Sequence, residues 1–347
     1  MKPSLKVIEP GIAATLQDGG REGHQRFGVP VSGALDRVSL EAANMLVGNA
    51  PHEAAIEVMA AGLTLMVCAE SVTLAAAGMA GPFALEAAQT VLRVAPFQSL
   101  VARRGDIVRF PPPKAGAVFY IAVAGGFDAP PVFGSKSTYV RASLGPLEGR
   151  SLHTGDMLPL RFEATPSSDP FSLDMRLAAP QVLRVMRGPN AEYFSPHAFE
   201  TLFASAYTIA PASDRMGLRL QGPHLTRAIE GELPSQGTTA GGLQVPSDGQ
   251  PILLMADRQT TGGYPRIATV IGADIAAAGR LAAGMDIRFE EVSRKDALRL
   301  LKEQRDWFAA LPSKLKLAVP PLTIERLLDA NLISGITSGS EEGDDHG

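Results

Sequence analysis

Short apolar runs bounded by glycine, proline or charged residues recur along the 347-residue chain. Runs of this length, rich in Val, Ile and Leu and separated by turn residues, predict β-strands rather than helices. In the first half we predict strands at 5–8, 55–62, 63–68, 72–78, 90–94, 106–110 and 117–123. In the second half we predict strands at 182–186, 207–210, 218–220, 252–256 and 267–271. The protein is therefore expected to be mainly β.

A smaller number of segments show helical spacing. Asp36 is placed to cap a helix through Leu46, because Leu40, Ala43 and Val47 follow at helical intervals and Gly48 ends the pattern. Ser293, with Asp296 three residues later, resembles a capping box and opens a helix toward residue 308. Further helices are predicted at residues 196–203, 274–282 and 324–333.

Residues 15–36, TLQDGGREGHQRFGVPVSGALD, contain six glycine or proline residues among charged ones. This composition predicts a loop with little regular structure. Loops of this length are usually functional or disordered. Phe27, Val29, Val31 and Leu35 give it apolar anchors, so we expect an ordered loop that faces a ligand.

Three similar phrases, each a turn followed by a strand, begin at Gly105, Gly155 and Gly284. Their unequal, long intervals indicate two related β modules rather than a solenoid. The Pro- and Ser-containing segment 163–174 is typical of a linker. The expected domains are a β module at 1–165, a second at 175–295, a helical extension at 296–337 and a disordered tail at 338–347.

Composition narrows the functional classes. The chain has 35 Gly, 27 Pro and 6% aromatic residues, which favours many short strands and turns. A net charge of -4 without a basic run argues against nucleic acid or anionic membranes as partners. Cys68 is the only cysteine, so no intrachain disulfide can form. With no apolar leader and no apolar run of membrane-spanning length, the expected location is the cytoplasm.

The strongest candidate for chemistry follows the apolar run 252–256, where a buried strand delivers polar residues and a glycine pair to its end. A polar substrate needs directional donors and acceptors on a rigid base, and this corner could supply them. The alternative is an Asp257–Arg258 ion pair that only pins a turn. The candidate catalytic residues are Asp257, Arg258 and Gln259, and the candidate substrate-binding residues are Thr260, Thr261, Tyr264 and Arg266.

Two further segments could contribute to this site. Residues 233–246 form a second glycine- and hydroxyl-rich loop, with Ser235 and Gln236 as candidate substrate-binding residues; a plain hairpin loop is the alternative. Polar residues of the first loop are candidates for the facing wall, although Asp36 could serve only as a helix cap. These candidates are Asp18, Arg21, Ser32 and Asp36.

Several common catalytic motifs do not occur. The six histidines show no HExxH spacing, and Cys68 lies in an apolar strand, so we predict no metal site and no cysteine nucleophile. Residues 133–139, FGSKSTY, lack the first glycine of a P-loop. No Gly-x-Ser-x-Gly elbow and no biotin-attachment sequence are present.

The phrases at 15–36, 43–49, 213–223 and 243–271 resemble the allophanate hydrolase subunit 2 family. This family is also called KipA, and it includes 5-oxoprolinase subunits and biotin-dependent carboxyltransferases. The resemblance runs from about residue 5 to residue 289. It implies two related cyclophilin-like β-barrel modules with a few short helices. Lys136 stands where the resemblance leads us to expect arginine, which weakens any bidentate contact assumed there.

The resemblance also implies partners and three alternative functions. The first is a subunit of an ATP-dependent 5-oxoprolinase that opens the lactam of 5-oxoproline to glutamate, working with a KipI-like and a LamB-type subunit. In that function Arg258 and Arg266 would contact carboxylate or phosphate, and Asp257 would act as a base or orient Arg258. The second is a carboxyltransferase that moves CO2 from carboxybiotin, carried by a partner, to a urea- or amide-like substrate. The third is a non-catalytic KipA-type regulator that binds a KipI-like kinase inhibitor.

Overall fold

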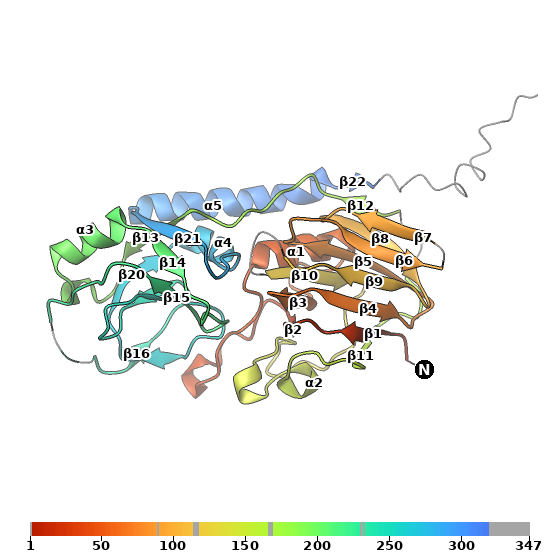
Figure 1. The fold of residues 1–347 in the computed structure, drawn as a ribbon, viewed down its shortest axis with the longest axis horizontal. Helices are drawn as coiled ribbons and strands as arrows, with labels where there is room; N and C mark the ends of the chain where they lie inside the picture. Colours follow the sequence, from red (N-terminus) through yellow and green to blue (C-terminus); the bar gives the residue numbers. More distant parts are fainter. Residues whose placement is uncertain are drawn as a thin grey trace, which may run out of the picture.

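The protein, seen here as a computed structural model, is described over residues 2–88, 90–113, 118–165, 169–229, 231 and 233–318. The described chain is mainly β, with a closed barrel and a few helices (Figure 1). This confirms the predicted fold class. The helix predicted at 324–333 and the predicted tail lie outside the described residues.

The N-terminal module consists of two antiparallel sheets that pack face to face around one core. The first sheet has the strand order β11 (Met157–Pro159), β1 (Ser4–Glu9), β4 (Leu63–Val67), β9 (Ile107–Phe110), β6 (Phe83–Ala87), β7 (Thr90–Val94). The second has the order β2 (Ala13–Gln17), β3 (Ala55–Met59), β10 (Val118–Val123), β5 (Ser71–Ala77), β8 (Gln98–Arg103), β12 (Phe171–Ser172), β22 (Lys316–Leu317).

The central strand β10 is buried on both faces and contributes side chains to two hydrophobic cores. Phe119, Ile121 and Val123 pack between the two sheets, whereas Tyr120 and Ala122 point to the other side, against α1 and the C-terminal module. This division follows from the two-residue period of a strand. A continuous apolar run such as VFYIAV is what burial on both faces requires. The two modules therefore share a hydrophobic core.

The C-terminal module is a closed barrel. In order around the barrel its strands are β13 (Val182–Arg187), β20 (Arg266–Val270), β17 (Gly242–Gln244), β18 (Ile252–Leu254), β15 (Gly217–Gln221), β14 (Tyr207–Ile209), β21 (Asp286–Glu291). All neighbouring pairs are antiparallel except β13 and β21, whose parallel pairing closes the barrel. A separate ribbon of β16 (Gln236–Gly237) and β19 (Thr261–Gly262) projects from it.

The helices cover the sheets and join the modules. Both predicted N-caps are confirmed: Asp36 Oδ1 accepts from the amides of Val38 and Ser39, and Ser293 Oγ accepts from the amide of Asp296. The α-helices are α1 (Arg37–Leu46), α2 (Pro146–Gly149), α3 (Pro196–Ala204), α4 (Ile275–Ala278) and α5 (Arg294–Ala310). The 3₁₀ turns are η1 (Gln25–Phe27), η2 (Val140–Ala142), η3 (Ala191–Tyr193), η4 (Gly272–Asp274) and η5 (Leu311–Lys314).

The recurrent turn–strand phrase is confirmed at all three places. Gly105, Gly155 and Gly284 have φ values of 92°, 91° and 85°, and the strands β9, β11 and β21 follow them. Glycine is needed in these turns because a side chain disfavours positive φ.

Three local expectations were wrong. The predicted loop 15–36 begins inside a strand, β2, which was overlooked because the segment as a whole is rich in glycine. Strands β6 and β8 were not predicted. The alanine-rich helix predicted over 274–282 is a 3₁₀ turn followed by the single α-turn α4, because the chain must close on Leu35 through Gly279.

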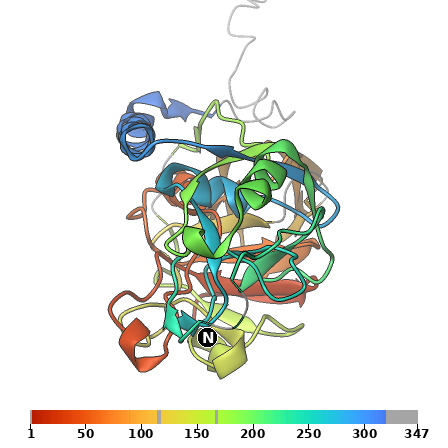
Figure 2. The same ribbon diagram turned by 90° about the vertical axis from the view of Figure 1, so that its left-hand side faces the viewer.

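Helix α5 and β22 lead the chain from the barrel back to the N-terminal module. α5 runs along one side of the molecule past both modules, and the view turned by 90° shows this helix end-on at the periphery (Figures 1 and 2). β22 then pairs with β12, Phe171 lying opposite Leu317. The segment predicted as a linker thus carries a strand that joins the second sheet through β8.

Candidate functional site

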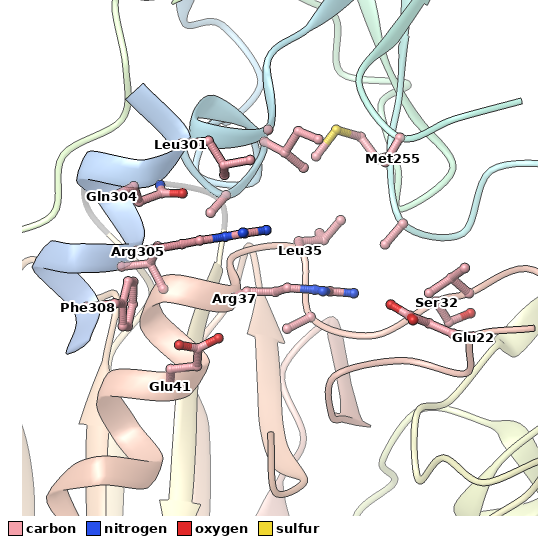
Figure 3. Close-up of a pocket in the computed structure, with 18 of the residues that line it drawn as sticks. Glu22, Ser32, Leu35, Arg37, Glu41, Met255, Leu301, Gln304, Arg305 and Phe308 are labelled. Carbon is pink, nitrogen blue, oxygen red and sulfur yellow. The ribbon is translucent and has the colours of Figure 1, made fainter. Parts of the chain in front are cut away.

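A cavity of about 520 Å³ lies at the junction of the two modules. Its walls come from the loop before α1, from α1, from the barrel corner after β18, from η4 and α4, and from α5. Figure 3 shows Glu22, Ser32 and Arg37 around this space, with Gln304 and Arg305 reaching it from α5. A volume of this size is typical of a small-molecule site.

The loop 18–35 is ordered by hydrogen bonds rather than by the predicted apolar anchors: of these only Leu35 is buried, and Phe27 is 68% exposed. The amide of Arg21 donates to the carbonyl of Val31 at 2.8 Å, and the amide of Ala34 donates to the carbonyl of Asp18 at 3.0 Å. The amide of Ser32 donates to the carbonyl of Ala256 at 3.2 Å, across the module junction. Ser32 is buried and has a left-handed φ of 54°, a conformation that costs energy for a residue with a side chain.

Asp18 holds this loop against residues 135–137. Its carboxylate accepts from the amide of Gly20 at 2.7 Å, from Ser135 Oγ at 2.6 Å and from the amide of Lys136 at 2.6 Å, and also from Ser137 Oγ. Lys136 Nζ bonds to Glu53 at 2.8 Å. Asp18 therefore orders the loop and does not line the cavity.

Arg215 joins the two modules. Its guanidinium bonds to Asp257 at 2.8 and 3.1 Å, to the carbonyl of Gly33 at 2.6 Å, and to Glu57 of β3. Burial opposes the charge on Arg215, but the carboxylates of Asp257 and Glu57 more than offset burial, so its pKa is raised.

Glu57 is itself part of a buried network. It accepts from the amide of Leu35 at 3.0 Å and from the Tyr120 hydroxyl at 2.5 Å. Burial, followed by the negative charges of Glu57 and Asp36, raises the pKa of Tyr120 well above its usual value. Tyr120 therefore stays protonated and acts as a donor.

Asp257 does not pair with Arg258, so the simple turn-pinning alternative does not describe this corner. Both Asp257 oxygens are held by Arg215, and Asp257 is only 5% exposed. Asp257 is therefore a structural residue that holds the segment after β18 in place, and it is not free to act as a base.

Arg258 and Ser32 line the cavity, and each has a buried polar atom without a partner among the described residues. Arg258 is 7% exposed, and its one hydrogen bond is from Nη1 to the carbonyl of Met255 at 3.2 Å. Within the described residues its Nε and the Oγ of Ser32 have no partner. Burial lowers the pKa of Arg258. A buried guanidinium without a carboxylate is costly unless an anion from outside pairs with it.

The remaining residues of the predicted corner do not line the cavity. Arg266 is buried and donates to the carbonyl of Gly237 at 2.8 Å and to Gln236 Oε1 at 3.0 Å, and burial lowers its pKa. The backbone of Gln259 and Thr260 bonds to Thr238. Thr261 lies opposite Gly237 in the ribbon. Ser235 and Tyr264 are exposed near it. These residues order the ribbon beside the corner.

Two predicted residues of the first loop are deeply buried outside the cavity. Asp36 caps α1 and lies 3.7 Å from Arg280 Nε; burial raises its pKa, and Arg280 opposes this. Arg21 is 1% exposed and donates from Nη2 to the carbonyl of Ser137. Burial lowers the pKa of Arg21.

Sequence reasoning missed Arg37, Gln304 and Arg305 at the cavity, and Arg215 at the junction. The sequence alone does not distinguish a helix arginine that lines a cavity from one that only faces solvent. Glu57 could have given a signal, because a carboxylate inside the buried strand AIEVM requires a buried cation.

The described residues contain no group of three or more His, Cys, Asp or Glu able to hold a metal ion. Cys68 is half-buried, with a free thiol. No helix in the part that the structure describes has the length and hydrophobicity needed to span a membrane. The donors at the cavity are guanidinium and hydroxyl groups, which suit an anion with a carboxylate or phosphate group.

The sequence and the fold are those of a carboxyltransferase-type domain. The family described as "Carboxyltransferase domain, subdomain A and B" matches residues 27–291, and the chain belongs to it. The chain is 37% identical over 312 residues to a 5-oxoprolinase subunit of Escherichia coli, covering 90% of this chain and 98% of that protein. It is 36% identical over 302 residues to the 5-oxoprolinase subunit of the same name from Haemophilus influenzae, covering 86% and 94%.

A similar solved structure is the urea amidolyase of K. lactis, with a TM-score of 0.79 and 26% identity. The alignment covers 93% of this chain but only 22% of the urea amidolyase chain. The family therefore includes both a subunit of about this length and one region of a much larger enzyme.

Proposed function

We propose that this chain is a subunit of an ATP-dependent 5-oxoprolinase, which opens the lactam of 5-oxoproline to glutamate. The observation that carries this proposal is the buried Arg258 at a cavity between the modules, which has no carboxylate partner among the described residues. The nearly full-length match to two proteins named as 5-oxoprolinase subunits supports it. The substrate is a small anion with an amide group, and the cavity offers guanidinium and hydroxyl groups.

A lactam carbonyl is stabilised by resonance and resists attack by water. ATP, when bound to the assembled enzyme, would supply a phosphoryl group that activates the amide carbon toward water. The ring C–N bond could then break with the nitrogen leaving as the amine, and a second water would release the phosphate, which leaves glutamate, ADP and phosphate. This chain binds and orients the lactam: Arg258 carries positive charge next to oxygen atoms that become negative, and Ser32 Oγ donates a hydrogen bond. Asp257 holds the corner through Arg215.

The proposed partners are a KipI-like subunit and a LamB-type subunit. The support for partners is the word "subunit" in the names of the E. coli and H. influenzae relatives. Partners would supply the parts of the reaction to which no described residue is assigned, including the activation of water.

Arg258→Ala in the complex reconstituted with both partners tests the proposal. We expect ATP-dependent glutamate release to fall by about 100-fold or more, as for loss of a group that stabilises developing charge. Arg219→Ala, at an exposed position on β15 of the same barrel, is the matched control and should leave the rate unchanged. If the wild-type complex releases no glutamate, the proposed reaction is wrong; if Arg258→Ala matches wild type, Arg258 has no role in it.

One observation favours a second candidate function. The matched family is described as a carboxyltransferase domain, and the fold also matches a urea amidolyase. The alternative is carboxyl transfer from carboxybiotin, carried by a partner chain, to a urea- or amide-like substrate at the same cavity. Inhibition of the complex by avidin would support this alternative, because avidin sequesters biotin.

A further inference from the structure

We propose that Arg305 of α5 and Arg37 of α1 together bind the carboxylate of the lactam substrate, and so select lactams that carry a carboxylate. This inference rests on the proposed function and assigns a substrate class to the same cavity. The two residues are called the carboxylate clamp below.

Both arginines lie at the cavity without a carboxylate partner. Arg37 makes one hydrogen bond, from Nη2 to the carbonyl of Gly19 at 2.8 Å. Arg305 has no hydrogen bond or ion pair among the described residues. On the same helix Arg299 pairs with Glu303 at 2.8 Å and Lys302 with Asp306, whereas Arg294 and Lys295, like Arg305, form no ion pair in the part of the chain that the structure describes. Arg37 and Arg305 are both exposed, and what distinguishes them from the other unpaired cations, Arg294 and Lys295, is that they line the cavity, where a ligand can reach both.

The charge around the cavity calls for an anion. Arg37, Arg258 and Arg305 outnumber the two carboxylates of the wall, Glu22 and Glu41. Within the described residues neither carboxylate forms an ion pair with these arginines; Glu41 lies 3.6 Å from His52 Nδ1 instead. Unpaired guanidinium groups around one space repel one another, and a bound carboxylate removes that repulsion with hydrogen bonds to both.

The direction of the side chains agrees with this role. Figure 3 shows Arg37 and Arg305 extending into the cavity from their separate helices, toward the side where Glu22 and Ser32 lie. A carboxylate held by the two arginines would direct the rest of a small molecule toward Ser32. The clamp and the Ser32 wall thus define two ends for a bound lactam acid.

One of the two clamp residues, Arg305, lies on α5, outside the residues that match the family model. The family match ends at residue 291, whereas α5 begins at Arg294. Gln304 Nε2 anchors the helix to the barrel by donating to the carbonyl of Ala273 at 2.6 Å. A wall supplied by a helix on the outside of the two β modules can vary in its cavity-facing side chains without changing either sheet core, which is what a specificity element requires.

The test compares two ligands that differ only in the carboxylate: 5-oxoproline and 2-pyrrolidinone. Binding of each to the purified full chain is measured by calorimetry. For wild type we expect tighter binding of 5-oxoproline. In Arg305→Ala and Arg37→Ala we expect 5-oxoproline affinity to fall by about tenfold or more, as for loss of a charged hydrogen bond, with 2-pyrrolidinone affinity unchanged. Arg299→Ala, on the same helix, is the control and should change neither.

The outcomes separate this inference from the proposed function. Equal binding of the two ligands by wild type, or unchanged 5-oxoproline binding in Arg305→Ala, overturns the clamp even when the reconstituted complex releases glutamate. Selective binding that is lost in Arg305→Ala supports the clamp, even when the complex releases no glutamate and the proposed reaction fails. Circular dichroism of each variant checks that α5 remains folded, and Arg305→Lys should restore part of the selectivity.

Discussion

Arg215 of the C-terminal module forms a buried ion pair with Glu57 of the N-terminal module. The side chain of Glu57 is fully buried, and that of Arg215 is 11% exposed. Arg215 also holds Asp257, next to Arg258, and the carbonyl of Gly33, next to Ser32. One side chain therefore holds the neighbours of Ser32 and Arg258, two residues that line the cavity and have buried polar atoms without a partner in the described chain.

Replacing Arg215 by Met should destabilise the protein by about 3–5 kcal/mol, because it leaves two buried carboxylates without their cation. Urea denaturation followed by fluorescence of Trp307 and by circular dichroism measures the loss. Arg219→Met, at an exposed position four residues later, serves as the control and should change stability little. An unfolding free energy equal to that of wild type in Arg215→Met would show that the pair does not hold the junction.

Gly279→Ala should destabilise the protein by about 1–3 kcal/mol by overpacking. An added Cβ would lie 2.4 Å from the carbonyl oxygen of Leu35 and 2.6 Å from its carbon, both backbone atoms of the other module. The φ of Gly279 is -61°, so alanine adopts this backbone without strain, and helix propensity alone would predict a gain in stability. Thermal unfolding decides between overpacking and helix propensity: overpacking lowers the melting temperature of Gly279→Ala, and helix propensity raises it.

Gly81→Ala is the matched comparison for Gly279→Ala, since a Cβ at Gly81 meets no atom within 4 Å. We expect its melting temperature to match that of wild type. A stabilised Gly279→Ala variant would mean that the modules are not in contact at this point.

Asp156→Asn should lower stability at neutral pH by about 1.5 kcal/mol through loss of charged hydrogen bonds. Arg150 binds both Asp156 oxygens at 2.7 and 2.9 Å, and this hydrogen bonding lowers the pKa of Asp156 below 3.8. The folded state therefore favours the ionised form. The stabilisation by ionised Asp156 is fully present above its unfolded pKa of 3.8. It is lost as the pH falls through the lowered pKa of the folded state.

Urea titrations of wild type and Asp156→Asn from pH 7 down to pH 2 measure this difference. The two curves of stability against pH should converge at the acid end. Asp306→Asn, which breaks an exposed pair on α5, should differ little from wild type at any pH. Parallel curves for Asp156→Asn would refute the assigned cause.

Ser32→Ala should weaken the binding of 5-oxoproline while leaving the stability of the protein almost unchanged. Ser32 Oγ is buried and has no partner in the described residues, so its removal should leave the unfolding free energy within about 0.5 kcal/mol of wild type. If Ser32 Oγ contacts the lactam, 5-oxoproline binding should weaken in the same variant. Calorimetry and urea denaturation on one preparation test both statements, and unchanged binding would remove Ser32 from the site.

Most of the fold could be predicted because the patterns that specify it are local. The apolar run of β10 indicated a strand, and Asp36 and Ser293 showed where helices begin. β2 was missed because its residues precede a cluster of glycines, so its pairing with β3 depends on a distant strand rather than on its own composition.

The site was predicted less completely, because it is built from distant parts of the chain. Asp257 and Arg258 are adjacent in sequence, which suggests a direct ion pair between them. Consecutive residues that leave a strand, however, point in different directions. Asp257 turns inward to Arg215, and Arg258 reaches the cavity. The contributions of Arg37 and Arg305 depend on how α1 and α5 meet, which no local pattern encodes.

The pairing of β12 with β22 has a consequence for synthesis of the protein. The ribosome releases the first strands of the second sheet long before residues 316–317, so this sheet keeps an open edge while the barrel is being made. The N-terminal half must wait, without its outermost strand, until residues 316–317 have been synthesised. That waiting period is when the exposed edge is most vulnerable to pairing with another nascent chain.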